Sequence, residues 1–463
     1  MGDLRRCLVT SAILVLACAL GCTNKNRALQ PNTHNHSRAT LMVPVAPLAA
    51  RQRDVVDRQS PTTAPVFDAD GIFFGIAISG GGSRSANFSA ACMFDLQELG
   101  LLQKADYVSS VSGGSLTAAY YCLATDKEWN PTNVQKRLTH SFADDVLWNT
   151  ILPWNWIFLT FSDWDRSDLL ADSFRKHLFT RDGKELTFAN LRDDRPRLLI
   201  NATDLQSGKP FVFSDESFDR INSDLLTYPI SHAVAASAAV PVLLHHVTLR
   251  DHSTSFKQYR HLIDGGVTDN LGIRTLTDIY DAQIRAAEQN DASNPYPRGA
   301  VFIVIDARTN FDAKLSNKSD IGLIETLATG AGLTSTVLIN RASSATLSEI
   351  IVEHSPEDVT AGTLRKQKEQ LERDGYLRLK DRGGRPVDVV HLALSRVNDV
   401  KDLPFASFSD RVNSIATYFN ISQTEAYNLY QAAELLTTYK FDGPLREVAK
   451  RMAETHSTSA PVR

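Results

Sequence analysis

Three consecutive glycines stand where the sequence passes from a predicted strand into a predicted helix. The strand covers residues 71–79, and the loop after it reads Gly80-Gly-Gly-Ser-Arg84. Glycines let the backbone approach a ligand closely, and the amides at a helix start favour negative charge. The dinucleotide fingerprint needs glycine where Ser85 stands, and the Gly-Lys-Ser/Thr run of the Walker loop is absent. We therefore favour an oxyanion hole, in which each N–H donor stabilises a developing alkoxide by roughly 3 to 4 kcal/mol.

A candidate nucleophile lies in the next glycine-containing turn. Ser110-Val-Ser-Gly-Gly114 follows a strand predicted over residues 107–111 and precedes a helix predicted from Leu116. This order is typical of a nucleophile elbow, a sharp strand-to-helix turn that requires small residues two positions either side of its serine, here Ser112. Gly114 meets that requirement, whereas Ser110 replaces the first glycine. Serine-glycine turns without chemistry are common, so this segment alone leaves a structural role open.

A candidate carboxylate lies in a third turn. Asp264-Gly-Gly266 follows the strand-like run Arg260-His-Leu-Ile263. The carboxylate could face the serine, although an Asp-Gly pair also forms turns without catalytic roles. A Ser-His-Asp triad stays open as an alternative, with His261 the first histidine to test. Its candidate histidines are His232, His245, His246, His252 and His261. The sequence shows no His-Glu-x-x-His spacing and no EF-hand loop, so we expect no catalytic metal, no calcium requirement and no cofactor.

Apolar strand-length runs alternate with helical stretches across the region that holds the three turns. The further strand candidates cover residues 197–203, 300–307 and 387–397, and helices are predicted over residues 87–99, 116–124 and 231–239. This alternation predicts an α/β layer fold with a mostly parallel sheet. The 463 residues are 43% hydrophobic, enough for a substantial core. With 49 Lys+Arg against 53 Asp+Glu, the chain has no basic footprint for nucleic acid.

In this order, the three motifs resemble the patatin-like phospholipase family, which is related to cytosolic phospholipase A2. Two further segments, 201–213 and 233–241, resemble the same family. The resemblance covers residues 70–310, and Ser110 is the one departure inside a catalytic motif. It implies a three-layer sandwich around a central, mostly parallel sheet, and hydrolysis of the acyl esters of lipids.

The resemblance also implies residue roles. Asp264 would take the proton of Ser112 directly, as a dyad. The implied oxyanion hole consists of Gly80, Gly81, Gly82 and Gly113, and the supporting residues are Arg84, Gly114, Gly265 and Gly266. The implied partners are a lipid or phospholipid and a membrane surface, with no nucleic acid and no protein partner indicated. A catalytically silent lipid-binding lipoprotein is the alternative, and an acyltransferase that uses an alcohol in place of water is a variant.

The first 21 residues predict a secretory signal. A basic start is followed by an apolar stretch of about 14 residues, shorter than the roughly 20 that a membrane-spanning helix needs. The small residues before Cys22 resemble a bacterial lipobox, with Cys18 as a second fit, so we expect lipidation of Cys22. Because Thr23 replaces the Asp that retains lipoproteins at the inner membrane, we expect the outer membrane, facing the periplasm of a bacterial cell envelope. A secreted form is the alternative.

The chain therefore divides into five predicted segments. They are a signal peptide (1–21), a lipid-anchored flexible tether (22–65), a patatin-like catalytic domain (66–310), a mainly helical extension packed on it (311–445) and a disordered tail (446–463). A capping box, Ser422-Gln-Thr-Glu425, supports a helix in the extension. Four of the five tryptophans lie within residues 147–164. This tryptophan-rich segment fits a membrane-docking surface, a lid over an acyl pocket or a buried helical hairpin.

Overall fold

The computed structural model describes residues 70–151, 166–241, 244–254, 256, 258–309, 343–355, 360–401 and 403–454. The predicted signal peptide, Cys22 and the predicted tether lie outside these residues. So do the side chains of the tryptophan-rich segment, including Trp148, and residues 310–342 of the extension. Among the described helices, none combines the length and the apolar composition that a bilayer crossing requires.

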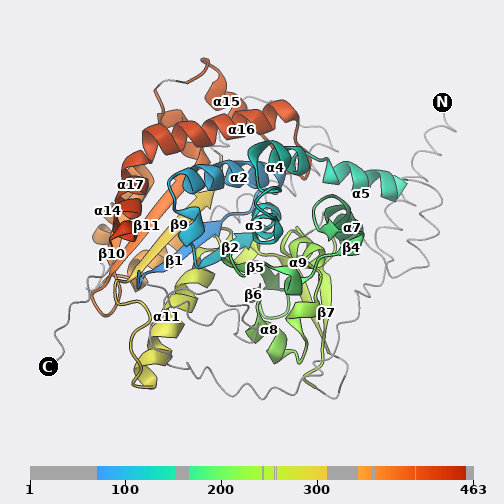
Figure 1. Cartoon of the computed structure of the whole chain (residues 1–463), viewed down its shortest axis with the longest axis horizontal. Helices are drawn as coiled ribbons and strands as arrows, with labels where there is room; N and C mark the ends of the chain where they lie inside the picture. Colours follow the sequence, from blue (N-terminus) through green and yellow to red (C-terminus); the bar gives the residue numbers. More distant parts are fainter. Residues whose placement is uncertain are drawn as a thin grey trace.

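A nine-stranded sheet forms the centre of the fold (Figure 1). Its strand order is β10-β11-β9-β1-β2-β5-β8-β7, and β6 pairs with β5. The strands are β1 (Phe73–Ile78), β2 (Tyr107–Val111), β5 (Arg197–Asp204), β6 (Lys209–Phe213), β7 (Val247–Asp251), β8 (Gln258–Asp264), β9 (Ala300–Asp306), β10 (Tyr376–Lys380) and β11 (Pro386–Ala393), with a separate hairpin of β3 (Thr180–Arg181) and β4 (Lys184–Glu185). From β11 to β5 the neighbouring strands are parallel. The predicted α/β class with a mostly parallel sheet is confirmed.

The central strands are apolar on both faces because helices cover both sides of the sheet. In β1, Phe74, Ile76 and Ile78 pack into one hydrophobic cluster, while Phe73 and Ala77 pack into the other. Strand side chains alternate between faces, so a strand covered on both sides reads as a continuous apolar run. This is why the chain folds into a strand directly before the glycine loop.

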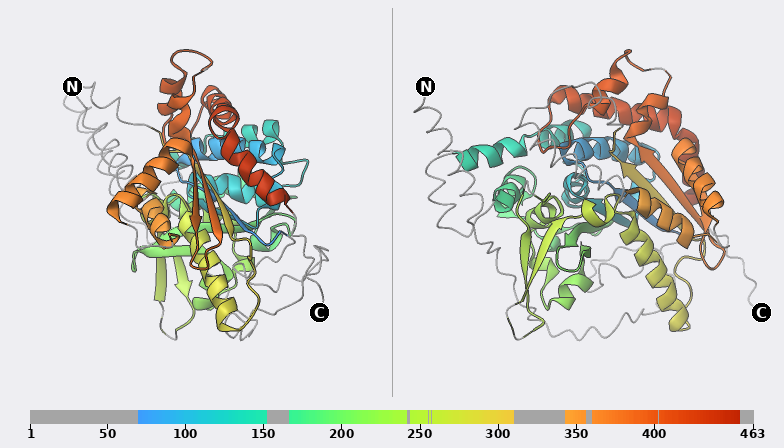
Figure 2. Two further views of the ribbon diagram at one scale, coloured as in Figure 1. Left: turned by 90° about the vertical axis from the view of Figure 1, so that its left-hand side faces the viewer. Right: turned by 180° about the vertical axis from the view of Figure 1, so that it is seen from behind.

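Helices form the two outer layers. Those packed on the first face include α2 (Gly82–Glu98), α3 (Gly113–Leu123), α9 (Ile230–Ser237), α16 (Gln423–Leu435) and α17 (Asp442–Ala453), and those on the second include α11 (Ile273–Gln289) and α14 (Ala361–Asp374). Figure 2 shows α2 and α16 on the opposite side of the sheet from α11. The remaining named α-helices are α4 (Pro131–Leu138), α5 (Phe142–Ile151), α7 (Arg166–His177), α8 (Asp215–Arg220), α10 (Gly266–Asp269) and α15 (Phe408–Asn413).

The C-terminal extension contributes strands to the central sheet as well as helices to the outer layers. Strand β11 pairs in parallel with β9, with Val387 opposite Ala300, and β10 pairs antiparallel with β11. The strand predicted over residues 387–397 ends at Ala393 and continues as a 3-10 helix, Leu394–Asp399. The capping box of Ser422 and Glu425 starts α16. The sheet therefore extends beyond the predicted boundary at residue 310.

The predicted disordered tail is wrong for residues 446–453, which belong to helix α17. Leu445, Val448 and Met452 recur on one face of that helix and are buried in the core. The Arg451 guanidinium is also buried, and it donates to the Asp388 carboxylate and to the Ala300 carbonyl. Apolar burial and this buried ion pair hold the helix on the end of the sheet.

Candidate active site

Strands β2 and β8 meet end to end on the same edge of β5, and this meeting creates the site. Val111, the last residue of β2, lies opposite Asn201 of β5. Asp264, the last residue of β8, lies opposite Ala202, the next residue of β5. The two strands run toward each other, so the turns that follow them start at the same place. Ser112 and Asp264, far apart in sequence, are thereby brought together.

Ser112 occupies a strained turn between β2 and α3. Its backbone angles are φ 49° and ψ −123°, a conformation that residues other than glycine rarely adopt. The Ser112 amide donates to Ser237 Oγ at 2.8 Å, and that hydroxyl donates to the Asn201 carbonyl at 2.6 Å. These bonds hold the turn in the conformation that a nucleophile elbow requires. The Ser112 side chain is nearly buried, with the residue 5% exposed.

The Asp264 carboxylate contacts the serine and its own turn. The Gly266 amide donates to Asp264 Oδ1 at 2.7 Å, and the Ser112 side chain lies close enough to the carboxylate to lower its pKa. Thr203 Oγ1 donates to the Asp264 carbonyl at 2.9 Å and fixes the backbone. Burial raises the pKa of Asp264 to about 6, against the lowering effects of the Gly266 amide and the Ser112 side chain. An ionised carboxylate at this pKa is a competent proton acceptor near neutral pH.

The glycine loop lies against the elbow. A Cβ added at Gly113 would lie 2.0 Å from the Gly82 carbonyl oxygen, so the two backbones are in direct contact. No hydrogen bond from the amides of Gly81, Gly82 or Gly113 to another described residue is found. Gly82 and Gly113 begin α2 and α3, whose amide ends carry partial positive charge. Three N–H groups are therefore available beside the serine.

Gly80 differs from its predicted role as an oxyanion donor. Its amide donates to the Asn270 carbonyl at 3.0 Å, because the loop that follows Asp269 passes directly beside it. A Cβ at Gly80 would lie 2.6 Å from Asn270 Oδ1 and 3.4 Å from Ser112 Cβ. Gly80 therefore provides the close approach between loop and elbow, and its amide is not available to an oxyanion.

The contact between the two loops makes Gly113→Ala a test of the site. The added methyl would overlap the Gly82 carbonyl, and overpacking of this kind costs about 1 to 3 kcal/mol. We expect a lower melting temperature and at least a ten-fold loss of esterase activity, since the loops must move apart. The control is Gly443→Ala in α17, where the added Cβ meets no atom within 4 Å. Unchanged activity in Gly113→Ala would contradict the loop arrangement.

The other predicted supporting residues all lie at the junction. A Cβ at Gly114 would lie 2.6 Å from the Ser79 carbonyl, and one at Gly265 would lie 2.3 Å from the Asn201 carbonyl. Both glycines are therefore required for close backbone packing. Ser110, the departure from the elbow pattern, is buried in β2 and donates through its hydroxyl to the Leu199 carbonyl at 3.3 Å. A serine is accommodated there because its polar atom has a partner.

Arg84 connects the glycine loop to the C-terminal extension. Its buried guanidinium donates to the Ile415 carbonyl at 2.8 Å, and burial lowers its pKa to about 10, which leaves it protonated at neutral pH. Close by, the Tyr418 carbonyl accepts the Ser83 amide at 2.8 Å. Residues 415–418, between α15 and α16, thus fix the outer side of the loop. The bracing role predicted for Arg84 fits these contacts, but the involvement of the extension had no sequence signal.

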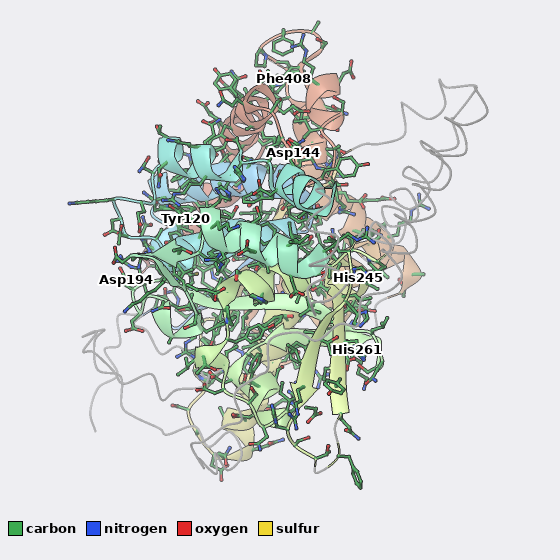
Figure 3. The ribbon with its side chains drawn as sticks, turned by 90° about the vertical axis from the view of Figure 1, so that its right-hand side faces the viewer. Tyr120, Asp144, Asp194, His245, His261 and Phe408 are labelled. Atoms are coloured by element: carbon green, nitrogen blue, oxygen red, sulfur yellow. The ribbon has the colours of Figure 1, made fainter. Side chains whose placement is uncertain are left out.

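The Ser-His-Asp alternative requires a histidine next to Asp264, and the described residues place none there. Within the described part of the chain, the Asp264 carboxylate has the Gly266 amide and the Ser112 hydroxyl as partners, and no histidine. His261 Nδ1 lies 3.0 Å from Thr248 Oγ1, and the His261 ring stacks edge-on with His246 at 4.6 Å. His261 also lines a surface pocket of about 410 Å³ with Gln206, Gln258, Tyr259 and Arg260. Figure 3 shows His245 and His261 on the same side of the molecule.

Three further residues hold the backbone around the dyad through hydrogen bonds, and the sequence patterns did not predict this role for them. Asn201 Nδ2 donates to Ser109 Oγ at 2.8 Å and to the Ser110 carbonyl at 2.9 Å, which ties β5 to β2 just before the elbow. Ser237 and Thr203 hold the backbones of Ser112 and Asp264, as described above. Ser237 is the only polar residue in the run from Ala233 to Ala239, and this isolated hydroxyl was the available signal.

The sequence comparison agrees with the class of protein that this fold and site define. Residues 76–277 match the family described as patatin-like phospholipase, and the matched segment contains the glycine loop, Ser112 and Asp264. Residues 76–277 therefore form a patatin-like phospholipase domain. For this part of the chain, the predicted family is confirmed. No match was found among curated proteins.

Three solved structures show similarity to this chain. One is human GIVD cytosolic phospholipase A2, with 12% identity and a TM-score of 0.49 over 83% of this chain and 63% of that one. A second is the same human protein in complex with methyl gamma-linolenyl fluorophosphonate, with 13% identity, a TM-score of 0.44, and coverage of 84% and 60%. VipD from Legionella pneumophila has 12% identity, a TM-score of 0.28, and coverage of 79% and 68%. The chain thus spans less than two thirds of the human protein.

Proposed function

We propose that the protein is a serine acyl hydrolase that cleaves carboxylic esters of lipids, with phospholipids as the substrates, through a dyad of Ser112 and Asp264. One observation carries the proposal: a serine on a strained strand-to-helix turn lies beside a buried carboxylate, close enough to lower its pKa, at the point where β2 and β8 meet. A strained serine paired with a carboxylate is an arrangement expected for nucleophilic catalysis rather than for a structural turn.

In the first half of the reaction, Ser112 Oγ attacks the ester carbonyl and its proton passes to the Asp264 carboxylate. The new C–O bond converts the carbonyl into a tetrahedral oxyanion. That intermediate collapses when the bond to the alcohol breaks, and the alcohol leaves with the proton from Asp264. The products of this half are an acyl-Ser112 ester and, from a phospholipid, a lysophospholipid.

In the second half, water attacks the acyl-serine ester. Asp264, ionised again, takes one proton from the water, and the tetrahedral intermediate expels Ser112 Oγ, which recovers that proton. A free fatty acid leaves the site. The same carboxylate serves as base and acid in both halves because its pKa of about 6 allows it to accept and return a proton near neutral pH.

We assign the oxyanion hole to the amides of Gly81, Gly82 and Gly113. They have no acceptor among the described residues, and Gly82 and Gly113 stand at the positive ends of two helices that meet beside the serine. Donors held in place before the reaction stabilise the developing charge without reorganisation. Arg84 is a positioning residue here, because its guanidinium holds the loop through the Ile415 carbonyl.

We further propose that the domain works at a membrane of a bacterial cell envelope, anchored through a lipidated Cys22 at the outer membrane. The lipobox-like residues before Cys22 and the polar segment from 23 to 65 support this placement. Several acyl chains on one cysteine would hold the protein on a bilayer durably, at about 0.8 kcal/mol per buried CH₂ group. The polar segment would give the domain freedom to reach lipid.

The test uses purified protein and phospholipid vesicles in which each acyl chain carries a different label. We expect equimolar release of one fatty acid and one lysophospholipid, with no phosphorylated head group released. The variant His261→Ala should retain wild-type activity within about two-fold, since His261 contacts Thr248 and not the dyad. Loss of activity in His261→Ala would favour the triad instead.

Two other outcomes are informative. A folded protein that releases no fatty acid from any ester would support the silent lipid-binding alternative. An added alcohol acceptor separates hydrolysis from acyl transfer, because a transferase would yield an acylated alcohol in place of the fatty acid.

A further inference from the structure

We propose that His140, Asp145 and His177 form a binding site for a divalent transition-metal ion, of which zinc is the representative. His140 lies between α4 and α5, Asp145 lies in the first turn of α5, and His177 is the last residue of α7. One ligand atom from each residue lies within 4.8 Å of the other two, and no other such group of three occurs in the described residues. Figure 1 shows α5 and α7 next to each other at one edge of the molecule.

The geometry of the three side chains suits one shared cation. Asp145 Oδ2 lies 2.9 Å from His140 Nε2 and 3.3 Å from His177 Nε2. The two imidazole rings stack with their centres 3.5 Å apart and their planes 24° from parallel, so both Nε2 atoms face the same carboxylate oxygen. Tetrahedral zinc with bonds of about 2.1 Å holds its ligand atoms about 3.4 Å apart. Only small side-chain adjustments separate this arrangement from a coordination sphere.

Neighbouring side chains orient and partly bury the three candidate ligands. Ser173, one turn before His177 on α7, donates its hydroxyl to Asp145 Oδ2 and so orients the carboxylate. The buried ring of Phe142 packs edge-on against His140, with the ring centres 5.1 Å apart. The three side chains are 31% to 38% exposed, which leaves a path for the ion and room for a water as a further ligand.

The donor set selects the class of metal. Two imidazole nitrogens and one carboxylate oxygen suit zinc and its neighbours, while calcium and magnesium prefer oxygen ligands alone. A bound ion would cross-link the start of α5 to the end of α7, the two helices that flank residues 152–165 in the chain. We therefore assign it a structural role, separate from the dyad of Ser112 and Asp264.

The test is titration of Zn²⁺ into untagged, chelator-treated full-length protein, followed by calorimetry and by thermal unfolding. We expect one ion per chain and a higher melting temperature with Zn²⁺ but not with Ca²⁺. His140→Ala and His177→Ala should weaken binding by more than about 100-fold, and Ser173→Ala by about 10- to 100-fold, as loss of an orienting hydrogen bond does. The control is His232→Ala, because His232 lies 3.8 Å from the Glu185 carboxylate and no third ligand group joins that pair in the described residues.

A second measurement covers the case in which a histidine variant fails to fold. Co²⁺ bound to the unmodified protein should show the visible absorption of a site with nitrogen ligands, and Zn²⁺ should displace it. The proposal is overturned if the wild-type protein binds neither ion at micromolar concentration. It is equally overturned if folded His140→Ala or His177→Ala binds Zn²⁺ with unchanged affinity and stoichiometry.

Discussion

Replacement of Ser112 by alanine is expected to lower kcat for ester hydrolysis by about 10⁵-fold or more, because no acyl-enzyme can form without the nucleophile. The bonds that hold the strained turn involve the backbone amide, which alanine keeps, so the variant should fold with a stability similar to that of the wild type. The measurement is the initial rate of fatty acid release from phospholipid vesicles, with circular dichroism to confirm the fold.

The matched control is Ser110→Ala, a buried serine two residues earlier in the same chain segment. Its hydroxyl donates to the Leu199 carbonyl and contacts neither Asp264 nor the glycine amides in the described structure. We expect this variant to keep its rate within about ten-fold. A similar loss in both variants would mean that the segment matters for folding rather than that Ser112 performs the chemistry.

Replacement of Asp264 by asparagine is expected to lower kcat by about 10³- to 10⁴-fold, the usual contribution of a positioned general base. In the wild-type protein, the activity should decrease as the pH falls below about 6, since the carboxylate must be ionised to accept the serine proton. Initial rates from pH 4.5 to 8 would show this single ionisation. A pH profile that is flat through pH 6 would contradict the assignment of Asp264 as the base.

The same substitution should stabilise the protein above pH 6. The pKa of Asp264 is raised from 3.8 to about 6 on folding, so the folded protein holds the proton more tightly than the unfolded chain. Between these two values the free energy of unfolding decreases as the pH rises, and above pH 6 ionised Asp264 costs about 3 kcal/mol. Asparagine carries no such cost. An inactive variant with a higher melting temperature at pH 7 is therefore the expected result.

Asp269 provides the matched control for both effects. It is buried in the same turn, and burial raises its pKa to about 6 as well. Its carboxylate accepts the amides of Leu271 at 3.1 Å and Arg274 at 2.9 Å, and it does not contact Ser112. Both oxygens of this carboxylate accept backbone amides, and asparagine offers only one acceptor oxygen, so Asp269→Asn should not gain the stability expected of Asp264→Asn. Most of the activity should remain. Equal loss of activity in the two variants would argue for a structural effect of the whole turn.

The parts of the site that could be predicted are those encoded by short local patterns. Glycines between a strand and a helix, a serine with small neighbours and an Asp-Gly-Gly turn each have a specific backbone requirement, and Gly113 and Gly265 show why no Cβ fits there. The family resemblance supplied the pairing of the three turns. The strands β1, β2, β5 and β9 were predicted within one or two residues because they are apolar on both faces.

The parts that could not be predicted depend on contacts between distant segments. β2 and β8 meet on one edge of β5 because Asn201 of β5 pairs with Val111 and the next residue, Ala202, pairs with Asp264. No local sequence pattern encodes this pairing. The hydrogen bonds from the Gly80 amide to the Asn270 carbonyl and from Arg84 to the Ile415 carbonyl also join segments that are distant in sequence. The three residues of the proposed zinc site are also separated in sequence, with His177 brought to Asp145 by the packing of α7 on α5. The predictions for Cys22 and the tether remain predictions.

The most direct test of the central claim is covalent labelling with a fluorophosphonate, followed by intact-mass measurement and peptide mapping. An activated serine displaces fluoride from this reagent, whereas an ordinary serine does not react. We predict one adduct per chain, located on Ser112, with no adduct in Ser112→Ala and a greatly reduced labelling rate in Asp264→Asn. Labelling of a different serine, or undiminished labelling of Ser112→Ala, would contradict the Ser112/Asp264 dyad.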